Sequence, residues 1–176
     1  MRADKRRGYT LIELVVTVLI IGILTSIAVP QYLKTVEVGK ADDAVATVNM
    51  IATTNKMYAL DHANFYVSGA SPTTATTACG TTVTCGAGTC AAGATATSAC
   101  YLVACKYLAD QDWGDRPYTF NACDPTGGGG GGGCAANMTA YTARAATANA
   151  PYNAWNYTVG STGLITAGGG APAPTF

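Results

Sequence analysis

The sequence predicts an α+β fold in which one long N-terminal α-helix packs on a small antiparallel β-sheet and disulfides staple the loops. Three observations support this class. An uncharged apolar run passes into amphipathic helical spacing, short alternating segments follow near the C-terminus, and all seven cysteines lie beyond residue 78. We expect a short leader (residues 1–8), an apolar helix (9–29), its amphipathic continuation (30–66) and a Cys-rich globular body (67–176).

The charge distribution is uneven, although the formal net charge of the 176 residues is zero. Residues 1–8 carry four basic side chains and Asp4, a balance of +3, and the rest of the chain carries six basic and nine acidic side chains. Because the body offers no basic surface to a polyanion, we expect no nucleic-acid partner. Only 11% of the residues are charged, which disfavours a charge-rich cytosolic enzyme.

The apolar run is long enough to span a membrane. Residues 14–29 contain no charge, and a helix counted from Tyr9 to residue 29 reaches roughly 30 Å at ~1.5 Å per residue. The basic cluster precedes this run, so the positive-inside rule places the N-terminus in the cytoplasm and the body outside. We therefore expect a single-pass protein anchored in membrane lipid.

Glu13 interrupts the apolar character of this segment. An ionised carboxylate in the hydrocarbon region costs about 2.5 kcal/mol or more, so its presence implies a cationic partner. Cleavage between Gly8 and Tyr9 creates an α-amine four residues before Glu13, and helical spacing predicts both on one helix face. In a helical array the amine of a neighbouring subunit serves equally well. Glu13 then sets the register of assembly, because only arrangements that pair it avoid the burial penalty.

Two other interpretations of this segment compete. In a conventional secretory signal peptide, Ser26 and Ala28 form a small-x-small site for cleavage before Val29. The acid inside the apolar core, and Pro30 at the second position after the cut, argue against it. The second alternative is a plain membrane anchor with a chance acid, and the cost of an unpaired intramembrane carboxylate argues against that.

The residues around the expected cleavage site resemble the prepilin class, which comprises type IV pilins and the pseudopilins of type II secretion. The motif reads Lys-Arg-Arg-Gly at residues 5–8 and Tyr-Thr-Leu-Ile-Glu-Leu at residues 9–14, with Tyr9 in place of the commoner Phe. The resemblance implies that a prepilin peptidase cleaves after Gly8 and methylates the new N-terminus at Tyr9. It also implies that inner-membrane assembly machinery builds a homo-oligomeric helical filament, guided by Glu13, in the periplasm or outside the cell.

The helix is expected to soften towards the end of the apolar run and then to continue. Pro30 removes a backbone donor, and Gly22 lowers the helix propensity upstream. We expect the stretch between them to be helical in lipid and able to unwind or extend in a filament. Amphipathic spacing then carries the helix to about Asp61. Its apolar positions are Ala41, Ala44, Val45, Val48, Ile51, Ala52 and Ala59.

The cysteines favour disulfides in an oxidising compartment over a metal site. They are Cys79, Cys85, Cys90, Cys100, Cys105, Cys123 and Cys134, with no Cys-x-x-Cys pair. We expect no metal ligand set and no cofactor. The odd count leaves one thiol free or paired between molecules. The single histidine, His62, is expected in a structural role at the end of the long helix, where a cation meets the helix dipole favourably.

The body is expected to combine loops with a few short elements. Residues 68–99 are rich in Ser, Thr, Ala and Gly, which predicts a loop held by cross-links, and residues 100–110 contain a short helix. Residues 127–133 form a seven-glycine loop, which lacks the Lys-Ser/Thr pair of a P-loop.

Strands are expected at two places in the body. Residues 118–120 alternate like a strand, and Trp155, Tyr157 and Val159 share one face of another. The turn at residues 160–163 returns the chain as a hairpin through residues 164–166. The aromatic side chains are expected to pack against the long helix.

A second resemblance bears on the choice within the class. Tyr-Ala-Leu-Asp at residues 58–61 and the run at residues 112–120 resemble the major pseudopilin of type II secretion. That family carries a downstream acidic loop that binds calcium, which this sequence replaces with cysteines and glycines. Asp110, Asp112 and Asp115 lack the Gly and Glu of an EF-hand. We therefore favour a structural subunit of a type IV pilus, with the major pseudopilin as the alternative.

Two further classes have less support. An exported enzyme tethered by its first helix needs a catalytic constellation, but the sequence offers a single histidine and no Gly-x-Ser-x-Gly elbow, so we expect no enzyme. The second class is a minor pilin that binds DNA or adheres to a surface. To bind DNA, such a pilin needs a basic surface, to which only Lys106, Arg116 and Arg144 contribute beyond the helix.

Overall fold

A long helix, a short helix, one 3-10 turn and a five-stranded sheet make up the part of the chain that the structure describes. This computed structural model describes residues 8–70, 99–109, 111, 116–127, 133–145 and 147–174. In chain order the elements are α1 (Leu11–Asp61), β1 (Gly69–Ala70), α2 (Cys100–Ala104), β2 (Tyr118–Ala122), β3 (Met138–Arg144), η1 (Tyr152–Ala154), β4 (Asn156–Gly160) and β5 (Ile165–Gly168). The chain divides into two compact units between Gly39 and Lys40, so α1 contributes to both.

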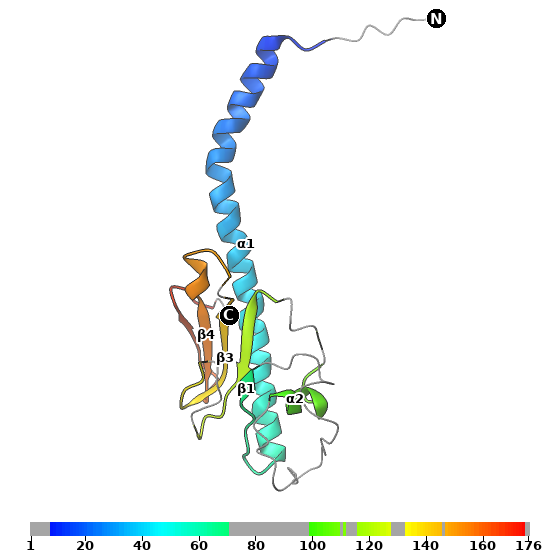
Figure 1. Ribbon diagram of the computed structural model, residues 1–176, viewed down its shortest axis with the longest axis vertical. Helices are drawn as coiled ribbons and strands as arrows, with labels where there is room; N and C mark the ends of the chain where they lie inside the picture. The colour runs from blue at the N-terminus through cyan, green and yellow to red at the C-terminus, as the bar shows by residue number, and fades with distance from the viewer. Residues whose placement is uncertain are drawn as a thin grey trace, which may run out of the picture. The chain divides into compact units, whose positions relative to one another are not determined.

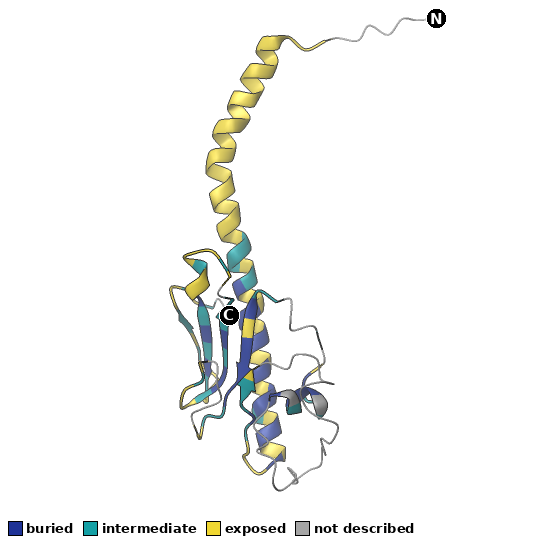
Figure 2. Ribbon diagram, in the orientation of Figure 1, coloured by how far each residue is buried: buried dark blue, intermediate teal, exposed yellow. Residues whose placement is uncertain are grey.

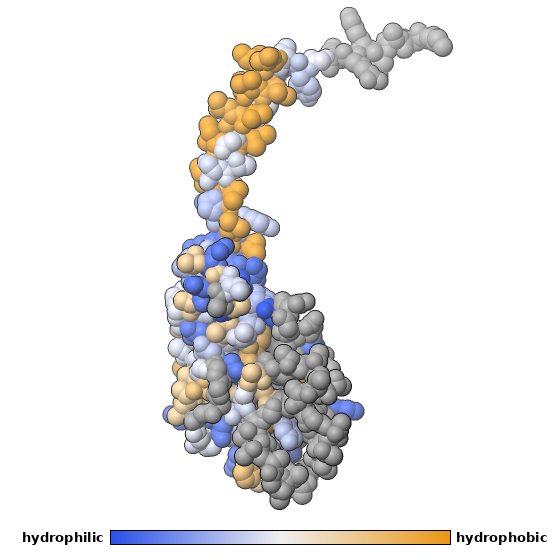
Figure 3. All heavy atoms as spheres, in the orientation of Figure 1, coloured by the Kyte–Doolittle hydropathy of each residue, from blue (hydrophilic) through white to orange (hydrophobic). Residues whose placement is uncertain are grey.

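The first unit contains the N-terminal part of α1. Every side chain from residue 11 to residue 33 is exposed, and most are large and apolar (Figures 2 and 3). The hydroxyls of Thr17, Thr25 and Ser26 donate to carbonyls one turn earlier in the helix. These polar groups therefore need no external partner in an apolar medium. Pro30 lies inside the helix, and α1 continues through it.

The second unit places the remainder of α1 against one face of the sheet (Figure 1). All neighbouring strands are antiparallel, in the order β1-β2-β3-β4-β5. An antiparallel sheet tolerates one solvated face, and Thr119 and Thr166 are exposed on the face away from α1. The expected α+β class, a long helix packed on a small antiparallel sheet, is confirmed.

The core of this unit lies between α1 and the sheet. All seven apolar helix positions expected from the spacing are buried: Ala41, Ala44, Val45, Val48, Ile51, Ala52 and Ala59. The sheet contributes the buried side chains of Tyr118, Phe120, Tyr157 and Val159, and Trp155 is buried directly before β4. Small and large side chains from both layers pack in the space between them, as a dense interior requires.

Asn55 fastens the helix to the sheet from within this core. Its side chain is fully buried, and its Nδ2 donates to the carbonyls of Val67, Cys123 and Thr139 at 3.0, 3.0 and 3.3 Å. Its Oδ1 accepts from the amide of Val67 at 3.0 Å. Burying an amide side chain costs free energy unless it is hydrogen-bonded. The site therefore favours the arrangement in which the backbones at Val67, Cys123 and Thr139 all lie next to Asn55.

The C-terminal hairpin follows the expected pattern. Trp155, Tyr157 and Val159 are buried, whereas Asn156 and Thr158 between them are half-buried. β4 pairs with β5 from Asn156 opposite Gly168 to Val159 opposite Ile165. The alternation expected from the sequence is therefore confirmed.

Two strands differ from the expectations. The central strand β3 gives no clear signal in the sequence, because its buried residues Thr139, Ala140 and Thr142 are small or polar. The expectation of a loop throughout residues 68–99 is wrong at its start, because Gly69–Ala70 pairs with β2 as β1. Residues 71–98 of that loop lie outside the described residues.

Cys123 and Cys134 form a disulfide with their Cα atoms 5.5 Å apart. It closes the segment of seven glycines, of which residues 128–132 lie outside the described part. Gly133 has a φ of +99°, and a side chain there would run into the ring of Tyr141, so this position requires glycine. Cys105 is disulfide-bonded as well. Bonds from the other cysteines stay a prediction, since none of their side chains is described: Cys79, Cys85, Cys90 and Cys100.

An aromatic cluster closes the C-terminal end of α1. The ring of the buried His62 stacks on Tyr58 with centroids 4.0 Å apart, and its Nδ1 lies 2.9 Å from the Tyr58 carbonyl oxygen. A carbonyl only accepts, so Nδ1 carries the proton. Tyr107 packs edge-on against both rings and donates its hydroxyl to Asp61 Oδ2 at 2.6 Å. These contacts give His62 a structural role.

Candidate processing and assembly site

A reciprocal cap between Thr10 and Glu13 closes the first turn of α1. Glu13 Oε2 accepts from the amide of Thr10 at 2.9 Å and from its hydroxyl at 2.8 Å. The amide of Glu13 donates to the Thr10 hydroxyl at 3.4 Å, and the Thr10 carbonyl accepts from the amide of Leu14 at 3.3 Å. This Thr-x-x-Glu arrangement is a capping box, which satisfies donors that the start of a helix leaves free.

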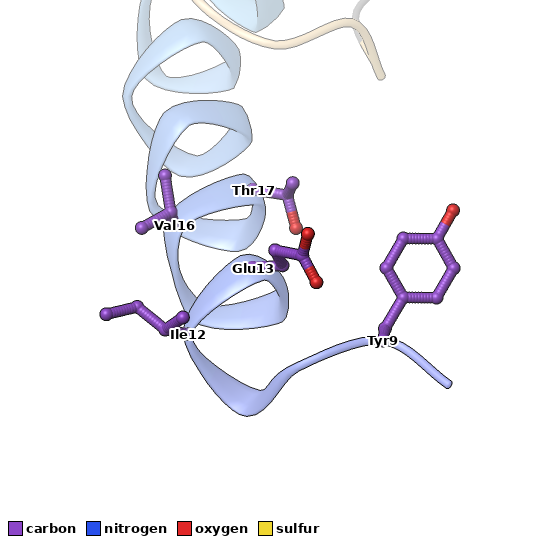
Figure 4. Close-up of a pocket in the computed structure, with 5 residues that line it drawn as sticks. All are labelled: Tyr9, Ile12, Glu13, Val16 and Thr17. Carbon is purple, nitrogen blue, oxygen red and sulfur yellow. The ribbon is translucent and has the colours of Figure 1, made fainter. Parts of the chain in front are cut away.

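The cap corrects the expectation that Tyr9 and Glu13 share a helix face. α1 begins at Leu11, so Tyr9 lies outside the helix. The physical reason is that Thr10 serves as the N-cap, a position whose backbone is not helical. Figure 4 shows the Glu13 carboxylate pointing to the side of the helix on which Tyr9 lies.

Glu13 borders a shallow hollow of about 410 Å³. It is lined by Tyr9, Ile12, Glu13, Val16 and Thr17. In Figure 4, Ile12 and Val16 lie on one side of the helix, and Glu13 and Thr17 lie on the other. An ionised carboxylate has about four lone-pair sites. Glu13 can therefore accept a bond from a cation while it remains bonded to Thr10.

The expected cleavage site lies directly before the cap. Gly8 and Tyr9 belong to no helix or strand, and Tyr9 is 89% exposed. Exposed, irregular backbone is the kind that proteases cleave. The peptide bond between these two residues is thus open to attack. Residues 1–7 of the leader lie outside the described part of the chain.

Gly22 and Pro30 lie further along α1, several turns beyond the cap. A Cβ atom built at Gly22 meets nothing within 4 Å, so no contact within the single chain requires glycine there. α1 is helical across both positions. Their softening role stays a prediction, as do the processing role of Gly8 and Tyr9 and the assembly role of Glu13.

Two tyrosines of the body have shifted pKa values that follow from their packing. Burial raises the pKa of Tyr157 to about 12, the charge of Asp42 adds to the shift, and the Tyr157 hydroxyl donates to the Pro172 carbonyl at 3.2 Å. The hydrogen bond to Asp61 raises the pKa of Tyr107. Within the described ranges, no three His, Cys, Asp or Glu side chains gather as a metal site requires.

Reading the sequence missed two residues that the structure shows to be central, Thr10 and Asn55. Thr-x-x-Glu directly before an apolar run is a sequence signature of a helix start, so the cap could have been found. Asn55 gives no such signal. A single polar residue in an amphipathic helix looks solvent-facing until the carbonyls opposite it are known.

Comparison with known proteins agrees with the motif at the start of α1. The family described as "Prokaryotic N-terminal methylation motif" matches residues 4–29. Type II secretion system core protein G of Escherichia coli (strain K12) is 43% identical over 68 residues, which are 37% of this chain and 46% of that protein. The protein of the same name from Pseudomonas aeruginosa is 37% identical over 62 residues, which are 35% of this chain and 44% of that protein.

These matches cover less than half of either relative, and no solved structure matches the chain significantly. Among the described helices, α1 is long and apolar enough to cross a membrane. The basic leader, the Thr10–Glu13 cap and the exposed apolar helix all fall in the matched N-terminal part. The chain thus carries the prokaryotic N-terminal methylation motif over residues 4–29, and it is similar over part of its length to two type II secretion system core proteins.

Proposed function

We propose that the chain is a structural subunit of a helical filament assembled from the bacterial inner membrane, and specifically a pseudopilin of a type II secretion system. Both relatives carry the name of a type II secretion core protein. They favour the pseudopilin alternative over the type IV pilin that the cysteine-rich body suggested. In this proposal the chain's role is structural rather than enzymatic.

One observation carries the proposal: a carboxylate lies at the start of a helix whose apolar side chains are all exposed as far as residue 33. A surface of this size is unfavourable in water, and it marks contact with a membrane or with other proteins. In lipid, the two donors of Thr10 reduce the cost of burying the Glu13 carboxylate. A single chain can therefore remain in the membrane before it pairs with another copy.

The step from lipid to filament depends on polar pairing. Lipid tails are as apolar as leucine, so helices gain little hydrophobic free energy by leaving lipid for one another. Cleavage after Gly8 by a prepilin peptidase supplies an α-amine at Tyr9. A neighbouring copy brings that amine to Glu13, where the low dielectric constant strengthens the attraction and fixes the register.

The same proposal assigns the parts of the chain. Residues 1–8 are the prepilin leader, residues 9–29 the membrane and filament-core helix, residues 30–66 its amphipathic continuation, and residues 67–176 the body. The assembly machinery extracts the cleaved chain from the inner membrane, and Gly22 and Pro30 let the helix adjust in the filament. The body is then periplasmic, which suits its disulfides.

Two measurements test the proposal. The intact mass of the protein extracted from membranes reports the loss of residues 1–8, the methylation of Tyr9 and the number of disulfides together. The yield of filaments released when the cell envelope is disrupted is then compared for the wild type, Glu13→Val and Glu13→Gln. Gln keeps an acceptor for the cap but removes the charge. Both variants should insert into the membrane normally. Each should lower the fibre yield by about tenfold or more, because each 1.4 kcal/mol of pairing free energy lost lowers the association constant by a factor of ten.

Thr10→Ser is the matched control, because it keeps the hydroxyl of the cap and should assemble as the wild type does. Normal fibres from Glu13→Gln would contradict the ion pair. A native chain that begins at Val29 would contradict the filament altogether. Deletion of the chain should abolish protein export if it is a pseudopilin, whereas loss of surface fibres with export intact would favour a pilin.

A further inference from the structure

The last strand, β5, forms an edge of the sheet. It stands at one end of the strand order and, in the described part of the chain, pairs with β4 alone (Figure 1). The amide of Gly160 donates to the Leu164 carbonyl at 2.9 Å, which fixes the phase of hydrogen bonding in the hairpin. Every second residue of an antiparallel pair bonds to the opposite strand, so the backbone groups of Ile165 and Ala167 point away from β4. We call these outward-facing groups the open edge.

The open edge has none of the usual protections. Ile165 and Ala167 are half-buried, and their backbone groups have no hydrogen-bond partner among the described residues. Proteins commonly protect an edge strand with a charged side chain, a proline or a bulge. The sequence of β5, Ile-Thr-Ala-Gly, has no charge and no proline, and its pairing with β4 is regular. Only its length of four residues limits what can pair with it.

Two hollows lie on either side of the open edge. The outer hollow, of about 440 Å³, lies on the sheet face away from α1, and its lining includes Asn137 and Thr166. The inner hollow, of about 500 Å³, lies on the face towards α1, and its lining includes Asn49 of that helix together with Ile165 and Pro174. Successive side chains of a strand point to opposite faces. The side chains of an added strand would therefore point to the outer and inner hollows in turn.

The linings indicate which side chains the hollows accept. Among the described residues, no charged side chain lines either hollow. Ile165, Ala173 and Pro174 make the inner hollow largely apolar, whereas hydroxyl and amide groups line much of the outer one. Lys56 lies near the inner hollow, with its Nζ 3.8 Å from the position of a Cβ at Gly163. A basic side chain would be repelled there. The open edge thus fits an extended segment in which apolar and small polar side chains alternate.

The length of β5 makes any such contact weak. A stable complex of two proteins buries about 800 Å² on each partner, from roughly 20–30 residues. A segment that pairs along four residues buries much less, so it is released readily.

A second copy of the chain fits the open edge poorly. Two copies joined through their β5 strands form a two-fold contact that admits no third copy, whereas a helical filament needs contacts between two different surfaces. The other edge strand, β1, is two residues long, which is too short to pair along β5. The segment is therefore expected to come from a different protein.

We propose that the open edge binds, as an added strand, an extended and non-basic segment of a protein that is being exported. This inference rests on the proposed secretion role and deepens it by naming a surface that exported proteins contact. Backbone bonds to Ile165 and Ala167 supply affinity for any extended chain, and the two hollows select its alternate side chains. Weak binding then allows the exported protein to leave.

A peptide of alternating valine and threonine tests the open edge directly. N-methylation of every second amide leaves one side of the peptide able to bond and stops the peptide from pairing with itself. The same peptide methylated at every amide is the matched control. Hydrogen exchange is measured at each amide of β5 in the full-length chain in detergent. At about 1 mM peptide, the amides of Ile165 and Ala167 should exchange at least about twofold more slowly, as a Kd of about 1 mM or tighter requires. The amides of Thr166 and Gly168, which face β4, should not change, and the control peptide should alter none.

Two variants of one residue separate backbone bonding from shape. Ala167→Pro removes an outward N–H but no bond to β4, and proline is tolerated at such a position of an edge strand. It should abolish the slowing at Ile165, whereas Ala167→Ser keeps the N–H and should preserve it. The urea midpoints of both variants are compared with that of the wild type to exclude unfolding. Unchanged exchange in the wild type, or equal slowing in both variants, overturns the open edge as a binding site.

Photocrosslinking in exporting cells identifies the partner. A benzophenone amino acid replaces Thr166, and the same probe in the Ala167→Pro chain is the control. The probe should join proteins that disappear from the culture medium when the chain is deleted, and the control should lose these crosslinks. Crosslinks to another copy or within one chain overturn the proposed partner, while normal export leaves the proposed function standing. If deletion of the chain does not change export, the secretion role fails, and the exported partner fails with it.

Discussion

The two parts of α1 are held in helical form by different interactions. Up to residue 33 the side chains are all exposed, and the polar ones bond within the helix itself. From Lys40 onwards one face is buried against the sheet, and Asn55 bonds to three backbone segments. Helix propensity alone stabilises a helix only weakly in water. Tertiary packing therefore keeps the second part helical, whereas the helical form of the first part depends on the medium around it.

The amino-acid composition of the first part suits a helix in lipid rather than a helix in water. It is rich in Val and Ile, whose branched side chains lower helix propensity in water. In lipid the cost of an unpaired backbone group outweighs that preference, and the helix persists. In the proposed filament, one helix thus serves as scaffold for the body in its second part and as interface in its first part, and substitutions should separate the two roles.

The largest effect on stability should come from Asn55→Ala in the second part. The change leaves the carbonyls of Val67, Cys123 and Thr139 without their side-chain donor in a buried site. We expect the free energy of unfolding to fall by about 3–4 kcal/mol. Urea unfolding of the full-length protein in detergent, followed by tryptophan fluorescence, measures it. Asn49→Ala, on the exposed side of the same helix, should change it by less than about 0.5 kcal/mol; equal losses would contradict the role of Asn55.

A smaller effect should follow from removing the disulfide between Cys123 and Cys134. The two residues are 11 apart in sequence, and closing a loop of that length stabilises the fold by about 2–3 kcal/mol through the unfolded state. Replacing both cysteines by serine should lower the free energy of unfolding by this amount without changing membrane insertion. An unchanged urea midpoint would show that the bridge does not constrain the body.

A third, weaker effect should appear at high pH, through Tyr157. Burial raises the pKa of Tyr157 from 10.0 to about 12. Its contribution to stability is therefore fully present below pH 10 and is lost as the pH rises towards 12. Tyr157→Phe should reduce this pH-dependent loss by about 1 kcal/mol, less than the full shift implies because nearby solvent screens the phenolate. Tyr32→Phe, in the exposed first part, is the control and should leave the pH profile of unfolding unchanged.

The sequence predicted the helix far better than the sheet, for a physical reason. Helical periodicity accumulates over many turns, so positions such as Ala41, Val48 and Ala59 could be assigned to the core together. The β4–β5 hairpin was also predictable, because Trp155, Tyr157 and Val159 alternate with polar residues before a glycine turn. The strand β3 was not, since its buried residues are Thr and Ala, which carry no hydrophobic alternation.

The candidate site was predictable in its chemistry and not in its geometry. Glu13 stands out because a charge inside an apolar helix is costly wherever it occurs. The position of Tyr9 depends instead on where the helix begins, which the hydroxyl of Thr10 decides. Asn55 could not be found, because Val67, Cys123 and Thr139 are distant in sequence and only the folded body brings their carbonyls together.

The smallest effect on the body should come from Gly22→Ala, which tests the difference between the two parts of α1 most directly. No atom lies within 4 Å of a Cβ at Gly22, so the urea midpoint of the body should not move. Within the helix, alanine is favoured over glycine by about 1 kcal/mol. The alanine should keep residues 22–30 helical in the filament, where we expect the wild type to unwind. Hydrogen exchange at the amides of these residues, in membranes and in filaments, measures how far they stay helical.

We expect wild-type exchange to be faster in the filament, and slow exchange in both settings for the variant. Equal protection of the wild type in both settings would mean that Gly22 and Pro30 do not soften the helix, and that the first part of α1 enters the filament unchanged.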